Sequence, residues 1–312
     1  MKIYSDYNDV PKSARGAVMA LGNFDGLHRG HQAVIAMAKE IARANNAPLA
    51  IGVFTPHPRR FFAPDSPPFR LMSKRLRAME MERLGVDILF EIDFDATLKN
   101  MSDEDFVARV LNKGLGLSHV LVGEDFKYGA GRMGDFDSLK THGAARGIGV
   151  SGCTPVGLHK FYGKYGSTQI REALAAGDVF HAAHMLSRPW TVDGIVSQGA
   201  QRGRTIGFPT ANVPFGDHMR PKFGVYAAEL RLDGEETWHA AVANTGTRPT
   251  VGGEEARIEA HIFDFDQDIY GRLVDVRFRS FIRDEKKFES FEQLAAQIDK
   301  DARGARAVLG VS

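Results

Sequence analysis

The first half of the chain alternates short apolar runs with helical patterns, and this alternation constrains the fold more than any other feature. Val18 to Leu21 is predicted to be a buried strand, Gln32 to Arg43 a helix with its apolar residues on one face, and Leu49 to Phe54 a second strand. A strand, a helix and a strand in this order form a βαβ unit, whose strands are parallel and whose crossover is right-handed. The pattern therefore predicts a parallel sheet covered by helices.

The alternation continues as far as residue 146. Helices are expected over residues 73–84, 102–111 and 136–146, and strands over residues 87–92 and 119–122. A doubly wound, Rossmann-like parallel sheet is the simplest architecture for such a series. The stretch from Pro56 to Pro68, rich in Pro, Phe and Arg, is expected to be a surface loop or flap.

A β-rich pattern begins at Trp190, after two expected helices over residues 168–176 and 180–186. Strands are predicted over residues 191–196, 225–232, 238–243, 258–263 and 274–278, and an amphipathic helix over 291–309. These strands favour a closed or sandwiched antiparallel domain, such as a β-barrel with a terminal helix. We place the boundary near Ser187, which gives domains of residues 1–186 and 187–312, in keeping with the two domains expected for 312 residues.

Composition limits the compartment and the partners. The chain has 40 basic and 39 acidic residues, without the basic excess of a nucleic-acid binder, so no nucleic-acid partner is expected. Cys153 is its only cysteine, which excludes an internal disulfide and a cysteine metal cluster. The N-terminus lacks the pattern of a secretory signal, and no apolar run approaches the roughly 18 residues of a membrane span. We expect a cytoplasmic protein without a membrane partner; the oligomeric state stays open.

The segment Gly22 to His31, GNFDGLHRGH, lies between the first predicted strand and helix. Its glycines allow tight turning, and the start of the helix offers unpaired N–H groups to an anion. His28 and His31 are three residues apart, so both rings would face one side of the helix and suit charge that builds up on a phosphate. The segment lacks the Lys-Ser/Thr of a P-loop, the spacing of a dinucleotide fingerprint and the His spacing of a zinc protease. The alternative is that the glycines only turn the chain and the histidines lie on the surface.

A second candidate segment, GAQRGRTIGFPTANV, covers residues 199–213. Its glycines with Arg202 and Arg204 could form an anion-binding loop. Thr210 and Asn212 are two residues apart, on one face of an extended chain, and offer hard oxygen ligands suited to magnesium rather than zinc. The alternative is that the glycines are barrel corners and the threonine is an ordinary strand residue.

These motifs together resemble a known family. GLHRGH is similar to the His-x-Gly-His signature of the nucleotidyltransferase superfamily, and GNFDGLHRGHQ resembles the bacterial bifunctional riboflavin kinase/FAD synthetases. FTPHPRRFF (54–62), GEDFKYGAGRMGD (123–135) and STQIREAL (167–174) resemble further elements of the first domain of that family. GRTIGFPTAN (203–212), VANTGTRPT (242–250) and RIEAHIFDFDQDIYG (257–271) resemble elements of riboflavin kinases. The resemblance covers nearly the whole chain.

The resemblance implies phosphorylation of riboflavin to FMN in the second domain and adenylylation of FMN to FAD, with release of pyrophosphate, in the first. ATP would be the co-substrate and Mg²⁺ the metal, and the partners would be the small molecules ATP, riboflavin, FMN and FAD.

The resemblance also implies residue roles. His28 and His31 would contact the α-phosphate region, and Arg171 would clamp the β- and γ-phosphates. Glu259 would be the general base for riboflavin, and Thr210 and Asn212 would hold Mg²⁺. His261 could be a neighbour of the site or a structural residue. The other nucleotide- and flavin-binding residues implied are Gly22, Asn23, Phe24, Asp25, Gly30, His57, Phe62, Asp125, Ser167, Thr168, Gly203, Arg204, Gly207, Pro209 and Asn244.

The sequence departs from the family pattern at four positions, Arg77, Glu124, Gly166 and Ser187. Two other functions stay open at this point. One is an adenylyl or cytidylyl transferase for another phosphorylated metabolite, and the other is a non-catalytic flavin or nucleotide sensor.

Overall fold

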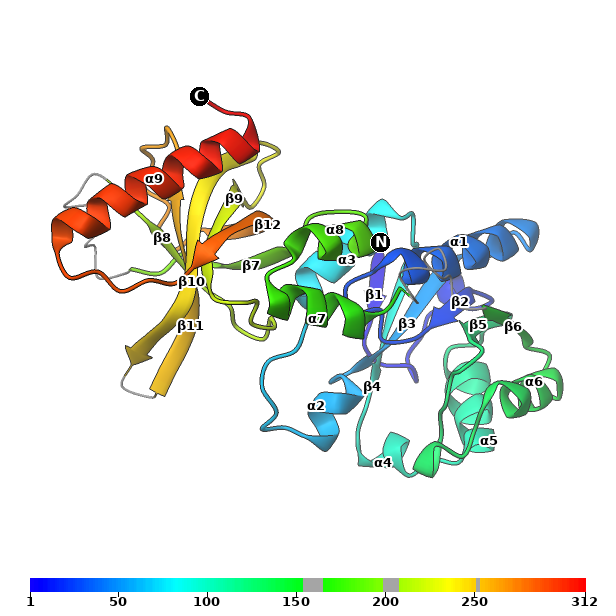
Figure 1. Ribbon diagram of the computed structural model, residues 1–312. Coiled ribbons are helices and arrows are strands. Elements are labelled where there is room, and N and C mark those ends of the chain that lie inside the picture. Colours follow the sequence, from blue (N-terminus) through cyan, green and yellow to red (C-terminus); the bar gives the residue numbers. More distant parts are fainter. Residues whose placement is uncertain (154–164, 199–207, 251–252) are drawn as a thin grey trace. The chain divides into compact units, whose positions relative to one another are not determined.

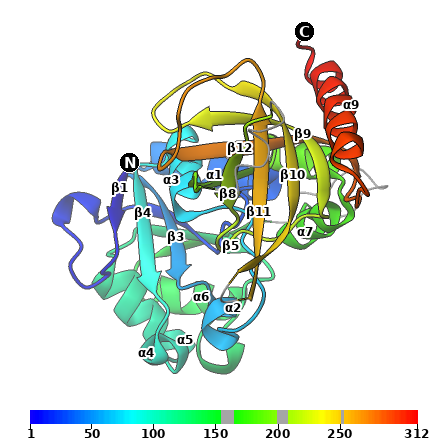
Figure 2. The same cartoon turned by 90° about the vertical axis from the view of Figure 1, so that its left-hand side faces the viewer.

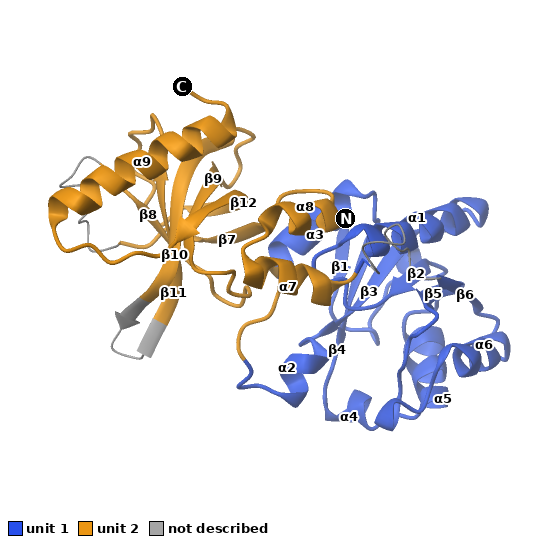
Figure 3. Ribbon diagram, in the orientation of Figure 1, with its two compact units in different colours: residues 1–66, 74–165 blue, residues 67–73, 166–312 orange. Residues whose placement is uncertain are grey.

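The structure, a computed structural model, describes residues 1–153, 165–198, 208–250 and 253–312 (Figure 1). Contacts group the chain into two compact units (Figure 3). Unit 1 consists of residues 1–66 and 74–165, and unit 2 of residues 67–73 and 166–312. Among the described residues, no helix combines the length and the apolar composition that crossing a membrane requires.

Unit 1 is built on a six-stranded parallel sheet, which confirms the predicted doubly wound fold. The strand order is β1-β4-β3-β2-β5-β6. The strands are β1 (Lys2–Tyr4), β2 (Val18–Leu21), β3 (Leu49–Thr55), β4 (Ile88–Asp93), β5 (His119–Gly123) and β6 (Gly149–Cys153). Strands β1 and β6 form the two edges, and neither was expected from the sequence.

The helices of unit 1 follow the predicted alternation, with two differences. They are α1 (Arg29–Ala44), α2 (Pro58–Phe62), α3 (Lys74–Arg83), α4 (Ala96–Lys99), α5 (Asp103–Asp105), a π-helical continuation (Phe106–Gly114) and α6 (Phe136–Ala144), with 3₁₀ turns at Lys12–Ala14 and Ala130–Arg132. The short helix α2 lies inside the stretch expected to be a loop, because the ring nitrogen of His57 caps it and a proline occupies its first turn. In the π-helical segment, the Leu115 N–H donates to the Val110 carbonyl at 2.8 Å, five residues back.

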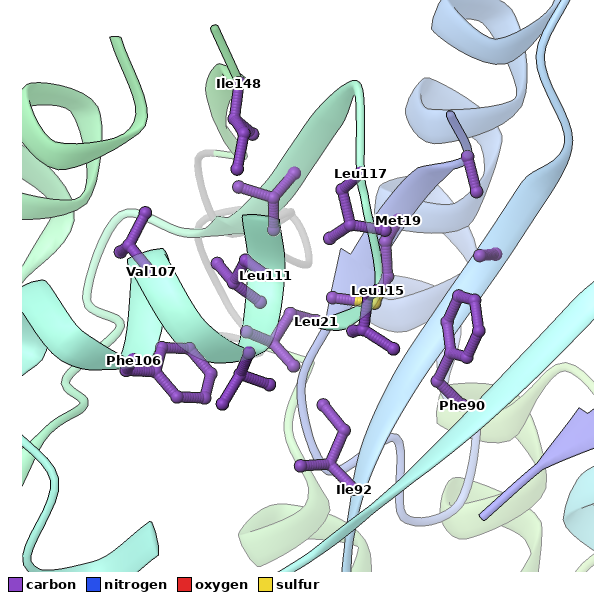
Figure 4. Close-up of a cluster of buried hydrophobic side chains, with 14 of the residues drawn as sticks. Met19, Leu21, Phe90, Ile92, Phe106, Val107, Leu111, Leu115, Leu117 and Ile148 are labelled. Carbon is purple, nitrogen blue, oxygen red and sulfur yellow. The ribbon is translucent and has the colours of Figure 1, made fainter. Parts of the chain in front are cut away.

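Buried side chains hold helices on both faces of this sheet. On one face, Met19 and Phe90 of the strands belong to the same apolar cluster as Phe106 and Leu111 of the π-helical segment (Figure 4). Neighbouring strand residues point to the opposite face, since side chains alternate along a strand. Helix α1 packs against β2, β3 and β5 on that face. The sheet is therefore the middle of three layers.

The strand order places the loop after β2 at a topological switch point. β2 pairs with β3 on one side and with β5 on the other, and all three run parallel. The segments that follow these strands therefore all start at the carboxyl ends of the strands, where ligands bind in open α/β folds.

Unit 2 is a six-stranded antiparallel sheet that nearly closes into a barrel, as expected (Figure 2). The strand order is β7-β12-β9-β10-β11-β8, and Ser197, just beyond β7, forms a bridge with Asn212 of β8. The strands are β7 (Thr191–Ile195), β8 (Ala211–Pro214), β9 (Gly224–Leu232), β10 (His239–Thr250), β11 (Gly253–Ile262) and β12 (Leu273–Asp284). β8 was not predicted as a strand.

The interior and the exterior of the barrel are packed differently. Tyr226 and Phe278 are fully buried, with ring centroids 5.1 Å apart, and Trp190 stacks on Phe278 at 5.2 Å. On the outside, helix α9 (Phe291–Leu309), as predicted, packs against β9, β10 and β12. A partly buried ion pair fixes this helix, since the Arg283 guanidinium donates to the Asp301 carboxylate at 2.6 Å.

Unit 2 also contains helices α7 (Ser167–Ala176) and α8 (Val179–Leu186) and residues 67–73, which we call the inserted segment. The Trp190 indole N–H donates to the Leu71 carbonyl at 2.8 Å, and the Ser73 hydroxyl donates to Asp193 at 2.9 Å. Figure 3 shows the inserted segment coloured with the barrel. Contacts thus group residues 166–186 with the barrel, and the domain boundary between residues 186 and 187 stays a prediction.

Candidate active sites

The loop after β2 is a tightly turned, well-anchored segment. Phe24, Gly26 and Leu27 all have positive φ angles, of 49°, 88° and 46°. The side chains of Phe24 and Leu27 are nevertheless buried, at 2% and 0% exposure. Phe24 and Leu27 therefore lie in the left-handed region of backbone conformation, which strains a residue other than glycine, and packing must offset that strain. Such strain is typical of functional loops.

The two histidines come together at the start of α1. His28 precedes the first helical residue, and its Nδ1 accepts a hydrogen bond from the backbone N–H of His31 at 3.3 Å. The two rings stack, with centroids 3.7 Å apart and planes 20° apart. The Phe24 ring lies 5.0 Å from the His31 ring. The spacing of three residues thus places both rings on one side, as predicted.

His31 is electrostatically unusual. Its Nδ1 is buried and has no hydrogen-bond partner among the described residues. Burial, and secondly the neighbouring His28, hold the pKa of His31 well below its ordinary value. The ring is therefore neutral at pH 7, and a neutral imidazole carries one N–H donor and one acceptor. A buried polar atom without a partner, at a helix N-terminus, is suited to an anionic ligand.

Gly30 is required by the position of the His28 ring. A Cβ atom at residue 30 would lie 3.1 Å from the Cε1 and Nδ1 atoms of His28 and 3.4 Å from the Tyr165 carbonyl oxygen. A side chain here would crowd the imidazole, so a glycine lets the backbone pass close beneath it without displacing the ring.

The other predicted residues of unit 1 also follow the carboxyl ends of strands in this sheet. In the loop after β2, Asn23 is exposed and Asp25 is buried, and Gly22 extends the pairing of β2 by donating to the Gly52 carbonyl at 3.1 Å. Asp125 is exposed, two residues after β5.

His57 caps the start of helix α2, after β3, and Phe62 is the last residue of that helix. The Nδ1 atom of His57 accepts a hydrogen bond from the backbone N–H of Arg59 at 3.1 Å. Phe62 is 61% exposed, and its ring meets those of Phe61 and Phe94 at 5.4 and 5.8 Å. An aromatic ring this exposed offers a flat apolar surface to a ligand.

Ser167, Thr168 and Arg171 lie on α7, in unit 2. The helix begins at Ser167 after Gly166, which contributes no side-chain cap. The Arg171 Nε–H donates to the Phe69 carbonyl in the inserted segment at 2.8 Å. That these three residues act together with His28 and His31 stays a prediction.

In the barrel, strand register aligns the second set of predicted residues. Asn244 of β10 lies opposite Glu259 of β11, and Glu259 lies opposite Asn212 of β8. Directly opposed residues of an antiparallel sheet share a face. Their chain neighbours Ile258 and Val213 are fully buried in the barrel, so the row Asn244–Glu259–Asn212 lies on the outer face. This is the face on which α9 packs against Val225 and Val242.

Few described residues bond the polar groups of this row, although Asn212 itself is only 5% exposed. Glu259 is half-buried, and neither its carboxylate nor the Asn244 amide bonds a residue within the described ranges. The Asn212 amide donates to the Thr210 backbone carbonyl at 3.4 Å. No described residue bonds the Thr210 hydroxyl or the Asn212 amide oxygen, and these are hard ligands that fit Mg²⁺. Gly203, Arg204 and Gly207 lie outside the described residues, and Pro209 is exposed.

Two contacts of unit 2 could not be recognised in the sequence, one between His218 and Asp193 and one between His261 and Pro209. His218, 4% exposed, lies 3.3 Å from the Asp193 carboxylate, which also accepts from Ser73. His261, left open by the sequence, shares the face of Glu259 because it is two residues further along β11. Its ring nitrogen Nδ1 lies 2.9 Å from the Pro209 carbonyl oxygen.

A doubly wound sheet with paired histidines at its switch point, followed by an antiparallel barrel with a row of Asn and Glu side chains on its outer face, defines a two-part nucleotide-dependent transferase. Comparison with known proteins specifies it further. The FAD synthetase family model matches residues 10–163, and the riboflavin kinase family model matches residues 186–309.

Relatives match along the whole chain. The bifunctional riboflavin kinase/FMN adenylyltransferase of Pseudomonas fluorescens is 39% identical over 100% of this chain and 99% of its own. The protein of the same name from Escherichia coli K12 is 38% identical, with the same coverage. A solved structure from Streptococcus pneumoniae, titled as a macrolide-efflux protein, is 33% identical with a TM-score of 0.86 and covers 97% of this chain and 98% of its own. The chain belongs to the bifunctional riboflavin kinase/FMN adenylyltransferase family.

Proposed function

We propose that this bifunctional riboflavin kinase and FMN adenylyltransferase divides its two reactions between the loop after β2 and the outer face of the barrel. The barrel phosphorylates riboflavin to FMN, and the α/β unit transfers AMP from ATP to FMN, giving FAD and pyrophosphate. The observation that carries the proposal is the buried Nδ1 of His31, which has no hydrogen-bond partner among the described residues and whose ring stacks on His28 at the start of α1.

In the adenylyl transfer, a phosphate oxygen of FMN attacks the α-phosphorus of ATP, and pyrophosphate leaves. Negative charge grows on the α-phosphate oxygens, where the N–H groups of His28 and His31 donate hydrogen bonds. The lowered pKa of His31 supports this role, because a neutral ring can donate without first binding a proton. The reaction otherwise depends on positioning.

The remaining residues of this reaction are proposed to bind substrates. Gly22, Asn23, Phe24, Asp25 and Gly30 bring the loop backbone close to the nucleotide. His57, Phe62 and Asp125 contact nucleotide or flavin, and Ser167, Thr168 and Arg171 contact the phosphates of ATP.

In the kinase reaction, the ribityl hydroxyl of riboflavin attacks the γ-phosphorus of ATP, and ADP leaves. Glu259 accepts the hydroxyl proton, a role supported by its half-buried carboxylate, which has no described protein partner. Thr210 and Asn212 hold Mg²⁺, which when bound offsets charge on the phosphate oxygens. Asn244, directly opposite Glu259, orients the acceptor, and Gly203, Arg204, Gly207 and Pro209 contribute to nucleotide binding.

The substrates are therefore ATP, riboflavin and FMN, with FAD as the final product. The near-equal numbers of basic and acidic residues support a small-molecule enzyme that does not act on nucleic acid. The single cysteine supports action in the reducing environment of the cytoplasm.

Separate substitutions test the division of labour. With riboflavin, ATP and Mg²⁺, the full chain should form FMN and then FAD. His28→Ala should lower FAD formation and leave FMN formation unchanged. Glu259→Gln should abolish FMN formation from riboflavin and leave FAD formation from added FMN unchanged. Equal loss of both activities in either variant would contradict two separate sites.

A further inference from the structure

We propose that His261 is a positioning residue of the kinase site, whose Nδ1–H fixes the peptide group that precedes Thr210. The inference rests on the proposed role of Thr210 as a ligand of Mg²⁺. The spacing of two residues between Glu259 and His261 on β11 does not reveal this role.

The contact determines which ring nitrogen carries the proton. His261 Nδ1 lies 2.9 Å from the Pro209 carbonyl oxygen, and a carbonyl oxygen only accepts. The hydrogen bond therefore requires a proton on Nδ1. The Phe208 and Phe263 rings meet the imidazole edge-on, at 5.0 and 5.8 Å, and hold its plane.

Thr210 is thereby held from both sides. The peptide group before it accepts from His261 through the Pro209 oxygen, and the peptide group after it accepts from the Asn212 amide through the Thr210 oxygen, at 3.4 Å. The Pro209 ring restricts φ just before Thr210, and Ala211 enters the sheet opposite Ala260 just after it.

The consequence concerns the Thr210 hydroxyl. With both flanking peptide groups fixed and a β-branched side chain, the hydroxyl has few positions to sample. It is therefore placed before any ligand arrives, which reduces the entropy lost when a metal-nucleotide complex binds.

This hydrogen bond contributes little to the stability of the barrel. Pro209 is exposed and His261 is only half-buried, so water can replace either partner if the bond is broken. Net stabilisation is small for a hydrogen bond that water can replace. Loss of the donor should therefore change the position of Thr210 without unfolding the domain.

The test compares three variants of the full chain. His261→Phe keeps a ring between Phe208 and Phe263 but removes the donor. His261→Asn keeps an N–H donor near the place of Nδ1. His239→Phe is the matched control, because His239 is also a half-buried histidine against an aromatic ring, Phe265 at 4.9 Å, and its imidazole bonds no residue in the described part of the chain.

We expect His261→Phe to raise the KM for Mg-ATP in riboflavin phosphorylation by about tenfold, with a smaller change in kcat, because a placed ligand acts in both ground and transition states. Amide hydrogen exchange over residues 210–213, measured without ligands, should be faster in this variant. His261→Asn and His239→Phe should resemble the unsubstituted chain in both measurements. FAD formation from added FMN should stay constant and report that the α/β unit is intact, and an unchanged free energy of unfolding in urea should report that the barrel is folded.

Two results would overturn the inference. An unchanged KM and unchanged exchange in His261→Phe would show that the hydrogen bond does not position Thr210. A His261→Asn variant as impaired as His261→Phe would show that the ring itself is needed, rather than its donor. If His261→Phe also loses FAD formation, the same comparison is made with His261→Leu.

Thr210→Val separates failure of the inference from failure of the proposed function. If Thr210→Val raises the KM for Mg-ATP and His261→Phe does not, only the positioning role is wrong. If Thr210→Val leaves riboflavin phosphorylation unchanged, the proposed role of Thr210 is wrong, and the inference falls with it.

Discussion

Replacing Gly30 with alanine tests how closely the geometry at the start of α1 controls adenylyl transfer. The added Cβ would lie 3.1 Å from two atoms of the His28 ring, closer than ordinary van der Waals contact, so the ring must move by a few tenths of an ångström. The ring cannot move alone, because it stacks on His31 at 3.7 Å and accepts from the His31 N–H. Both histidines are therefore displaced.

Two opposing terms set the stability of this variant. Alanine in place of glycine within a helix stabilises by about 1 kcal/mol. Crowding in a packed region costs about 1–3 kcal/mol. We expect a net loss of roughly 0–2 kcal/mol, which a folded domain tolerates. Activity should fall further than stability, because a misplacement of about 1 Å can cost about a hundredfold in rate. For a shift of a few tenths of an ångström, we expect about a tenfold loss of FAD formation.

The assay measures FAD formation from FMN and ATP, together with the free energy of unfolding in urea. Gly304→Ala is the matched control, because Gly304 lies in α9 and a Cβ there would meet nothing within 4 Å. The free energy of unfolding of Gly304→Ala should rise by up to about 1 kcal/mol, and both activities should be unchanged. A folded Gly30→Ala variant that forms FAD at the original rate would refute the argument that ring placement limits the reaction.

Two further predictions concern stability. The pKa of His31 is lower in the folded protein than in the unfolded chain, so the unfolded state binds a proton first as the pH falls. The free energy of unfolding should therefore be highest above about pH 6.5, the pKa of an unperturbed histidine. It should decline below that pH until the pKa of folded His31 is reached. Urea unfolding at pH 7.5 and 5.5 should show this decline, reduced in His31→Gln; an equal decline in both would refute it. Asp301→Asn should lower the free energy of unfolding by about 1.5–3 kcal/mol, because it leaves the partly buried Arg283 without its carboxylate. Asp264→Asn, which breaks an exposed ion pair with Arg306, should change the free energy of unfolding little. Equal losses in the two variants, measured by urea unfolding, would contradict this difference between the two ion pairs.

The sequence predicted those elements whose pattern is local. β2 and β3 are apolar runs with clear ends, and α9 begins and ends at the predicted residues. β6 contains Gly149 and Gly152, which weaken a strand pattern, and it forms because β5 pairs with it along its length. β8 is only four residues long and is defined by its pairing with β11. Such pairing energy does not appear in the segment's own composition.

The candidate sites were predictable to a similar extent. A spacing of three residues placed the rings of His28 and His31 together, since helix geometry is the same in every protein. The row Asn244–Glu259–Asn212 was not predictable, because a one-residue change of register would move each side chain to the other face of the sheet. The contact of His261 with Pro209 joins residues 52 positions apart, and no local rule anticipates it.

The inserted segment has a consequence for how this chain can be divided. A polypeptide that starts at residue 187 would lack Leu71, whose carbonyl accepts from the buried Trp190 indole N–H. A buried donor left without an acceptor costs about 1–3 kcal/mol. Such a fragment would also lack the Ser73 hydroxyl at Asp193. No single cut between the halves yields a barrel that keeps residues 67–73, so a chain divided at residue 187 would need another acceptor for the buried Trp190 donor.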